Sequence, residues 1–303
     1  MCGIAGAVDL IGRRSFPAER LEAMCAAIAH RGPDDEHFHR APGIALGARR
    51  LAIVDLEGGR QPLSNEDGTV WVAFNGELFE YPELFRQLTS RGHRLATRCD
   101  TEIWVHMYED YGEALFQRVK GQFAVSLWDD KGRSLILARD RVGICPLYYA
   151  KQDGWLLWSS EIKGLLASGM VPVEPDTKGI NTVFSLCHAS ATRTCFTGIQ
   201  SIPPGHYLRV RDGHPHMVKY WDLDFPDAGD ERREGNLRDT IDELEHLLRQ
   251  SIRRRLRGDV PVVACLSGGI DSTMVTTLAS QEAGEPVPSF TVSLDGAGRD
   301  EGG

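Results

Sequence analysis

The chain has 303 residues, of which 42% are hydrophobic and 25% are charged, and its 34 basic residues against 43 acidic ones leave a net charge of −9. This composition is typical of a soluble globular protein, and the acidic excess argues against a nucleic-acid-binding protein, which usually has a basic surface. The opening MCGIAGAVDL lacks the basic start of a signal peptide, and no apolar stretch reaches the length of a membrane span.

Residues 1–222 show short β runs broken by turns, with a few amphipathic segments between them. We expect strands at 4–10, 43–46, 52–54, 70–74, 122–128, 134–140 and 155–159. We expect helices at 18–30, 82–91 and 101–111. The strand at 70–74 is expected to stop at Asn75-Gly76, and the strands at 122–128 and 134–140 to form a hairpin. Many antiparallel strands with helices set apart indicate a layered α+β domain.

Residues 223–236 are polar and charged, and we expect them to form a linker. Apolar residues at helical spacing then predict a helix over 237–257. The continuous apolar run Val260–Leu266 is typical of a buried parallel strand, and a helix over 271–283 and a strand over 289–294 should follow. One such β-loop-α-β unit cannot bury both faces of a parallel sheet, so we expect the second domain to be incomplete in this chain.

Seven cysteines are scattered along the sequence, an odd number without a C-x-x-C pair. We therefore expect free thiols in a reducing cytoplasm rather than a disulfide framework. Cys2 directly follows the initiator methionine. If Met1 is removed, residue 2 carries both a thiol and an α-amine with a pKa of about 8, which can activate it as a nucleophile. A cysteine at this position alone is more often a packing residue.

A cysteine nucleophile that cleaves an amide needs hydrogen-bond donors for the developing oxyanion and groups that hold the substrate. The Asn75 amide and the Gly76 N–H are candidate donors. Arg50 has the fork that pairs with a carboxylate, and Glu77 and Asp100 can accept an ammonium group. Together these residues suit a free amino acid that bears an amide, which is glutamine. Asn-Gly is also a common turn signal, and spacing alone does not bring these residues together.

Nine segments, in order, resemble motifs of class II glutamine amidotransferases, with the order and spacing of the glutamine-hydrolysing asparagine synthetase family. They are MCGI, HRGPDD, RRLAIVDLEGGRQPL, FNGELFEY, DTEIWVH, GQFAVSLWD, ARDRVGICPLYY, SSEIKGLL and IPPGHYL. The resemblance implies an α+β four-layer N-terminal nucleophile hydrolase sandwich, followed by the start of an α/β ATP-pyrophosphatase-type domain. Cys145 departs from the family pattern, which usually has a basic residue there, and this puts local interdomain contacts in doubt rather than the glutaminase chemistry.

The resemblance also implies roles for individual residues. Cys2 corresponds to the nucleophile, and Asn75 and Gly76 to the oxyanion hole. Glutamine would be held by the side chains and backbone of a larger set: Arg50, Leu51, Ala52, Ile53, Val54, Asn75, Gly76, Glu77 and Asp100. The loop over 30–34 corresponds to a loop beside this pocket.

A second motif, SGGIDS at 267–272, joins the expected strand at 260–266 to the expected helix at 271–283. Glycines let the backbone approach a phosphate, and the N–H groups at a helix start favour an anion. The motif lacks the Gly-Lys-Ser/Thr of a Walker A loop. It resembles the pyrophosphate-binding loop of ATP-pyrophosphatases, which implies ATP and Mg²⁺. The ATP-binding residues are then Leu266, Ser267, Gly268, Gly269, Asp271, Ser272 and Val292.

The resemblance implies a glutaminase domain at 1–222, a linker at 223–236 and the N-terminal part of a synthetase domain at 237–303. The whole enzyme would hydrolyse glutamine at Cys2 and transfer ammonia to an AMP-activated aspartate. Two alternatives stay open: an amidotransferase that acts on another carboxylate, and a truncated relative that synthesises nothing. The oligomeric state is also open, a homodimer included. Three His or Cys groups, at 37–39, 187–195 and 214–216, fit no ligand framework, so we predict no metal held by side chains.

Overall fold

The structure is a computed structural model that describes residues 1–227 and 236–292. Its chain forms two compact units, Met1–Leu223 and Asp224–Gly303, and each is described by itself. Most of the expected linker, residues 228–235, and the end of the expected strand at 289–294 lie outside the described residues. Within the described ranges, no helix combines the length and the apolar character that crossing a bilayer requires.

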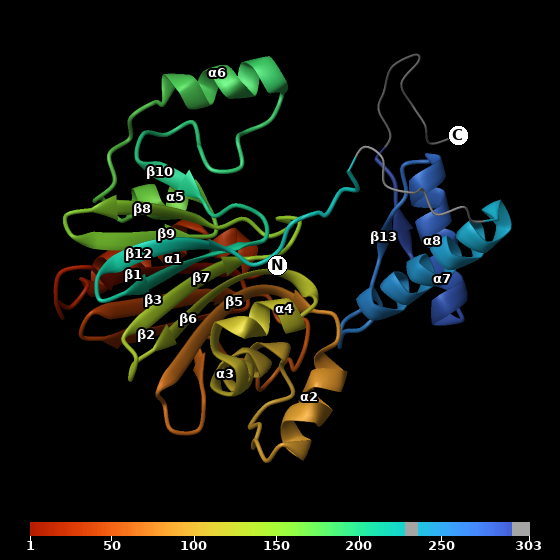
Figure 1. The fold of residues 1–303 in the computed structure, drawn as a ribbon, viewed down its shortest axis with the longest axis horizontal. Coiled ribbons are helices and arrows are strands. Elements are labelled where there is room, and N and C mark those ends of the chain that lie inside the picture. The colour runs from red at the N-terminus through yellow and green to blue at the C-terminus, as the bar shows by residue number, and fades with distance from the viewer. Residues whose placement is uncertain (228–235, 293–303) are drawn as a thin grey trace. The chain divides into compact units, whose positions relative to one another are not determined.

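The first unit contains two six-stranded sheets, and every strand pair in them is antiparallel. The order of the first sheet is β10 (Ile199–Ser201), β8 (Tyr148–Gln152), β9 (Trp155–Ser159), β1 (Gly3–Asp9), β3 (Ile44–Arg50) and β2 (Asp35–Ala41). The order of the second is β12 (His214–Lys219), β11 (His206–Arg211), β7 (Ser134–Arg139), β6 (Gly121–Asp129), β5 (Val70–Leu78) and β4 (Leu63–Ser64). The expected hairpin is the β6–β7 pair. Figure 1 shows the two sheets stacked face to face.

Helices cover the outer faces of both sheets. On the first sheet these are α1 (Ala18–Ala27) and α5 (Ile162–Ala167), and on the second they are α2 (Tyr81–Ser90), α3 (Asp100–Tyr111) and α4 (Leu115–Arg118). A further helix, α6 (Thr177–Leu186), is mostly exposed, and the short 3₁₀ turns Ala29–Arg31 and Gly112–Ala114 extend α1 and α3. The result is a helix–sheet–sheet–helix sandwich.

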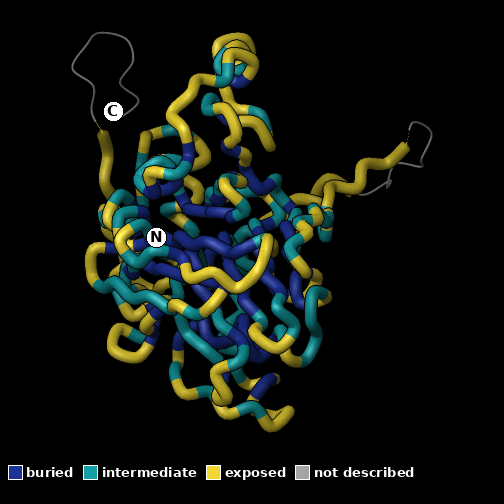
Figure 2. The backbone as a smooth tube through the Cα atoms, turned by 90° about the vertical axis from the view of Figure 1, so that its left-hand side faces the viewer, coloured by how far each residue is buried: buried dark blue, intermediate teal, exposed yellow. Residues whose placement is uncertain are grey.

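Three apolar cores hold these four layers together, and strand alternation explains how. In β1, Ile4 and Val8 face the core between the sheets, while Ala5 and Ala7 face the core beneath α1. A third core lies between the second sheet and its helices, around Trp104. Figure 2 colours the residues by burial, and β1, β3 and β9 are buried along almost their whole length. Both sheets are therefore rigid supports for the side chains at their strand ends.

Two strand predictions in the first unit were wrong, and side-chain hydrogen bonds and pairing give the reasons. No strand forms at 52–54, because β3 runs on to Arg50 and the next amides bond to side chains: Ala52 N–H donates to Asp34 Oδ2 at 2.9 Å. The strand β5 does not stop at Asn75-Gly76 but continues to Leu78, because β6 pairs with it residue by residue. Pairing thus overrides the turn preference of Asn-Gly.

The second unit contains α7 (Leu237–Arg255), β13 (Ala264–Cys265), α8 (Ile270–Ala283) and β14 (Ser289–Phe290). The expected helices are present, and β13 pairs with β14 in parallel. The prediction of a buried strand over 260–266 was wrong: only two residues form it, and Val263 is 49% exposed. Among the described residues only β14 pairs with β13, so the apolar run lacks the neighbours that bury a parallel strand.

Candidate active site

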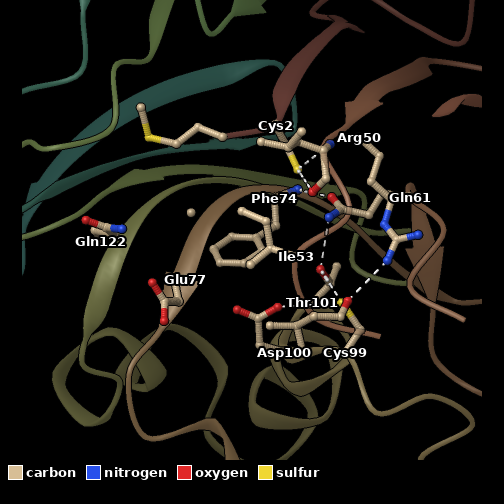
Figure 3. Close-up of a pocket in the computed structure, with 14 residues that line it drawn as sticks. Cys2, Arg50, Ile53, Gln61, Phe74, Glu77, Cys99, Asp100, Thr101 and Gln122 are labelled. Carbon is tan, nitrogen blue, oxygen red and sulfur yellow. Dashed lines mark hydrogen bonds between the residues drawn. The ribbon is translucent and has the colours of Figure 1, made fainter. Parts of the chain in front are cut away.

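A cavity of the first unit opens where β1, β3 and β5 approach the start of α3 (Figure 3). Its lining consists of Met1, Cys2, Arg50, Leu51, Ile53, Val54, Gln61, Phe74, Gly76, Glu77, Cys99, Asp100, Thr101 and Gln122. Most of the residues expected to hold glutamine therefore share one cavity. Two of them, Ala52 and Asn75, are not in its lining.

Cys2 reaches the cavity from the start of β1. Its Sγ accepts the Leu51 N–H at 3.4 Å and lies 3.7 Å from the Leu51 carbonyl oxygen. The Cys2 carbonyl accepts a hydrogen bond from Arg31 Nε at 3.0 Å, and Glu161 holds the Arg31 guanidinium at 2.9 Å. Burial raises the pKa of the Cys2 thiol, although the Leu51 hydrogen bond opposes this effect. The thiol is therefore protonated near neutral pH and needs a base before it can attack.

Asn75 and Gly76 lie beside each other in β5. The Asn75 side chain is fully buried, and neither its Oδ1 nor its Nδ2 finds a hydrogen-bond partner among the described residues. Buried amides are normally paired, so an orphaned one calls for a reason. Gly76 packs against β6: a Cβ there would lie 2.0 Å from the Gln122 carbonyl oxygen and 2.7 Å from Phe123 Cα. Only glycine fits, and its backbone lines the cavity.

Asp100 and Glu77 supply carboxylates across the cavity from Cys2, as Figure 3 shows. Asp100 begins α3 and is buried, and its Oδ2 accepts the Leu78 N–H at 3.0 Å. Burial raises the pKa of Asp100 to about 6, because the hydrogen bonds from Leu78 and its neighbours offset only part of the lost hydration. A buried carboxylate of this kind favours a cationic ligand.

Arg50 ends β3 and is buried, and its guanidinium binds backbone rather than open solvent. Nη1 donates to the Leu56 carbonyl at 3.1 Å, and Nη2 donates to the carbonyls of Val54 and Asp55 at 3.1 and 2.5 Å. These three bonds fix the loop after β3, which carries Ile53 and Val54 into the cavity. In the structure Arg50 therefore positions the cavity wall in addition to lining it.

Sequence reasoning missed six residues of the lining: Met1, Gln61, Phe74, Cys99, Thr101 and Gln122. Gln61 is buried, donates to Thr101 Oγ1 at 2.9 Å and accepts the Phe74 N–H at 2.7 Å. It therefore ties β5 to α3 behind the cavity. The signal for it was its place in RRLAIVDLEGGRQPL, but its contacts join segments that are distant in the sequence.

Cys145 does not line the cavity and is fully buried in the core between the sheets. Its N–H donates to Asp140 Oδ2 at 2.9 Å, and its carbonyl accepts from Arg139 Nε at 2.8 Å. Burial raises the pKa of this thiol to about 12, so it stays neutral. A neutral cysteine suits this core position, where a charged side chain would be costly.

The SGGIDS loop of the second unit joins β13 to α8. Ser272 Oγ accepts the Ser267 N–H at 3.2 Å and donates to the Gly269 carbonyl at 3.1 Å, so the loop is folded back on the helix start. Gly268 has a φ of +85°, which favours glycine. Leu266 is partly buried, whereas Asp271 and Val292 are exposed. The N-terminus of α8 and the two hydroxyls suit a phosphate, and the Asp271 carboxylate suits its cation.

Comparison with known families gives two matches. Residues 1–221 match the glutamine amidotransferase domain, and residues 243–303 match asparagine synthase. One curated relative is asparagine synthetase (glutamine-hydrolysing) 3 of Bacillus subtilis (strain 168), 33% identical over 97% of this chain and 48% of its own length. Another is amidase chry2 of Gibberella zeae, 36% identical over 92% of this chain and 43% of its own length. The chain spans about half the length of these relatives.

Among solved structures, glutamine phosphoribosylpyrophosphate amidotransferase from Bacillus subtilis, complexed with ADP and GMP, has a TM-score of 0.53 with 17% identity, over 98% of this chain and 68% of the other. At this identity the likeness shows the fold, and with the two matches it confirms the predicted fold class. The chain belongs to the glutamine amidotransferase family, and its amidotransferase domain is followed by an asparagine synthase segment, as in the glutamine-hydrolysing asparagine synthetases.

Proposed function

We propose that this chain hydrolyses glutamine to glutamate and ammonia, with Cys2 as the nucleophile. The observation that supports the proposal is the cavity: one wall carries the Cys2 thiol, and Glu77 and Asp100 supply carboxylates across from it. Glutamine has an ammonium group for these carboxylates and an amide carbonyl for the thiol. The buried Asp100 carboxylate in particular favours a cationic end over a neutral one.

The reaction begins once Met1 is removed, because the α-amine of Cys2 then becomes free. This amine takes the thiol proton, and the thiolate attacks the amide carbon. The Gly76 N–H and the Asn75 amide stabilise the oxyanion, and the amine returns the proton to the leaving ammonia. Water then hydrolyses the thioester to glutamate and regenerates the thiol. The raised pKa of Cys2 explains why a base is needed.

For the whole protein we propose glutamine-dependent asparagine synthesis, with residues 1–222 as the glutaminase domain, 223–236 as the linker and 237–303 as the start of the synthetase domain. ATP would supply the activating adenylyl group, with Mg²⁺ as its counter-ion. Backbone N–H groups at Gly268 and Gly269 and the hydroxyls of Ser267 and Ser272 would hold its phosphates, with Asp271 facing the cation. Aspartate is the proposed acceptor, and a reducing cytoplasm is the proposed setting, since all seven cysteines are free.

A second candidate keeps the glutaminase and changes the acceptor carboxylate. The observation that favours it is the likeness to amidase chry2, whose identity to this chain is as high as that of the synthetases. Both candidates share the chemistry at Cys2 and differ only in what receives the ammonia.

The Cys2→Ala variant tests the proposal in an assay that resolves glutamate, pyrophosphate and amide product separately. We expect glutamate release from glutamine to be lost, while Cys265→Ala, an exposed cysteine in the second unit, keeps it. Intact mass should show that Met1 is absent from the active protein. Glutamate release by Cys2→Ala at the wild-type rate would refute the nucleophile assignment.

A further inference from the structure

A cluster of imidazole and carboxylate side chains lies around α3, and none of its members lines the cavity. His106 and Glu109 project from one face of α3, three residues apart. His93 comes from the segment between α2 and α3. Ligand atoms of these three residues all lie within 4.8 Å of one another. Sequence reasoning did not find this cluster, because His93 and His106 are 13 positions apart.

Two of the three distances in the cluster, those from the Glu109 carboxylate, match the spacing between the ligands of a small divalent cation. Glu109 Oε2 lies 3.0 Å from His106 Nδ1 and 3.5 Å from His93 Nδ1. Tetrahedral zinc with bonds of about 2.0 Å sets its ligand atoms about 3.3 Å apart. The two measured distances lie on either side of this value. One carboxylate oxygen therefore already faces both Nδ1 atoms at the spacing that a shared metal ion requires.

The remaining ring nitrogens face carboxylates, as in metal sites where a second group orients each histidine. His93 Nε2 lies 3.1 Å from Asp110 Oδ1. His106 Nε2 lies 3.6 Å from Glu102 Oε1, which is beyond a hydrogen bond, and it is buried without a partner among the described residues. Asn65 Nδ2 donates to the other Glu109 oxygen at 2.7 Å. These outer groups thus contact atoms other than the three proposed ligand atoms, which remain available to the ion.

Charge and access also suit a cation. Glu66, Glu102, Glu109 and Asp110 bring four carboxylates to the cluster. Two fixed positive charges oppose them: Arg91, at 2.6 Å from Asp110, and Lys131, whose charge interacts with Glu109. The Glu66 carboxylate lies 3.9 Å from His106 Nδ1, and its side chain is 48% exposed, so it can move to complete the site. His106 itself is fully buried. The cluster thus has a fixed interior and an open side for entry.

We propose that His93 Nδ1, His106 Nδ1 and Glu109 Oε2 bind a divalent transition-metal ion with the ligand preference of zinc, and that Glu66 supplies a fourth ligand. Imidazole with carboxylate is a ligand set that zinc accepts. Such an ion cross-links α3 to the segment before it and to the turn at Glu66. The role of the site is to stabilise the first unit, since no cavity residue belongs to it.

The experiment is a titration of the purified 303-residue chain, freed of metal, with Co²⁺. We expect one equivalent to give the ligand-field absorption of a four-coordinate nitrogen–oxygen site, without the charge-transfer band that thiolate ligands produce. Zn²⁺ should displace the bound Co²⁺, which removes the absorption, and should raise the unfolding temperature. No absorption, or a thiolate band, would overturn the proposal.

Variants separate this site from adventitious binding. His93→Asn and Glu109→Gln change partly exposed side chains, so the fold should survive, and tryptophan fluorescence checks it. We expect each to weaken Co²⁺ binding by at least ~10-fold. The matched control is His37→Asn, which removes a histidine that pairs with one carboxylate, Asp35, at 3.0 Å. Wild-type Co²⁺ binding by both test variants would overturn the proposal, and loss in the control alone would do so as well.

Discussion

The buried carboxylate of Asp100 should destabilise the first unit near neutral pH, and Asp100→Asn should remove this cost. The folded chain raises the pKa of Asp100 from 3.8 to about 6. The folded pKa lies above the unfolded one. The contribution of the protonated Asp100 to the stability of the first unit is therefore fully present below about pH 4 and is lost as the pH rises through about 6. A pKa difference of this size corresponds to about 3 kcal/mol at pH 8 and about 0.5 kcal/mol at pH 4.

Asparagine keeps the shape and one acceptor, so the Leu78 N–H bond at 3.0 Å can survive the change. We therefore expect Asp100→Asn to be more stable than the wild type by up to about 3 kcal/mol at pH 8, and by far less at pH 4. Under the proposed function the kcat/KM for glutamine should fall by about 10–100-fold, because the substrate ammonium group loses its counter-charge.

Urea unfolding followed by tryptophan fluorescence measures this difference at both pH values. All six tryptophans lie in the first unit, so the signal reports that unit alone: Trp71, Trp104, Trp128, Trp155, Trp158 and Trp221. Asp9→Asn is a control of opposite sign. Burial would raise the pKa of Asp9, but hydrogen bonds from Arg14 outweigh it and lower the pKa to about 2, so that variant should lose stability at pH 8. If the stability gained by Asp100→Asn over the wild type is no larger at pH 8 than at pH 4, the reasoning is refuted.

Three further changes probe the supports of the cavity. Gly76→Ala places a Cβ 2.0 Å from the Gln122 carbonyl and should cost about 3 kcal/mol or more in urea unfolding, against about 1 kcal/mol for Gly68→Ala, where the space is open. Gln61→Ala leaves the Phe74 N–H without its acceptor and should cost about 1–3 kcal/mol; equal stability of the two proteins would contradict the contact. The third change is Glu161→Gln. Burial raises the pKa of the wild-type carboxyl, but hydrogen bonds from Arg31, Lys163 and His30 lower it to about 2. The wild type should therefore be the more stable protein above about pH 4.5, and the two stabilities should converge as the pH falls through 2. A difference in unfolding free energy between the two proteins that stays constant from pH 4.5 to 2 would contradict the role of these ion pairs.

Local patterns and the order of the motifs were enough to predict the layered fold and several residues that line the cavity. The β run over 4–10 predicted β1, whose opposite faces meet two different cores. The motif resemblance brought Cys2, Arg50, Glu77 and Asp100 together, and all four line one cavity. These predictions succeeded because each depends on residues close in sequence, or on a motif order that the family shares.

The errors and omissions depend on contacts between distant segments. Residues 52–54 have strand-forming side chains, but the Asp34 carboxylate takes the Ala52 N–H, and the amide leaves the sheet. Gln61 reads as a loop residue until the structure places Phe74 and Thr101 against it. The run over 260–266 has a composition typical of a buried strand, but burial requires neighbours on both sides, which composition does not supply.

The buried polar groups at the cavity restrict which ligands it can bind. Burial keeps the Cys2 thiol protonated and raises the pKa of Asp100, and the Asn75 amide is buried with neither atom paired. The ionised Asp100 carboxylate and the unpaired Asn75 amide destabilise the empty unit, whereas the neutral Cys2 thiol does not, and the three apolar cores offset the cost. A ligand that brings a cation to Asp100, which lines the cavity, removes the first of these penalties. Under the proposed function we therefore expect glutamine, whose ammonium group is such a cation, to be preferred over simple neutral amides.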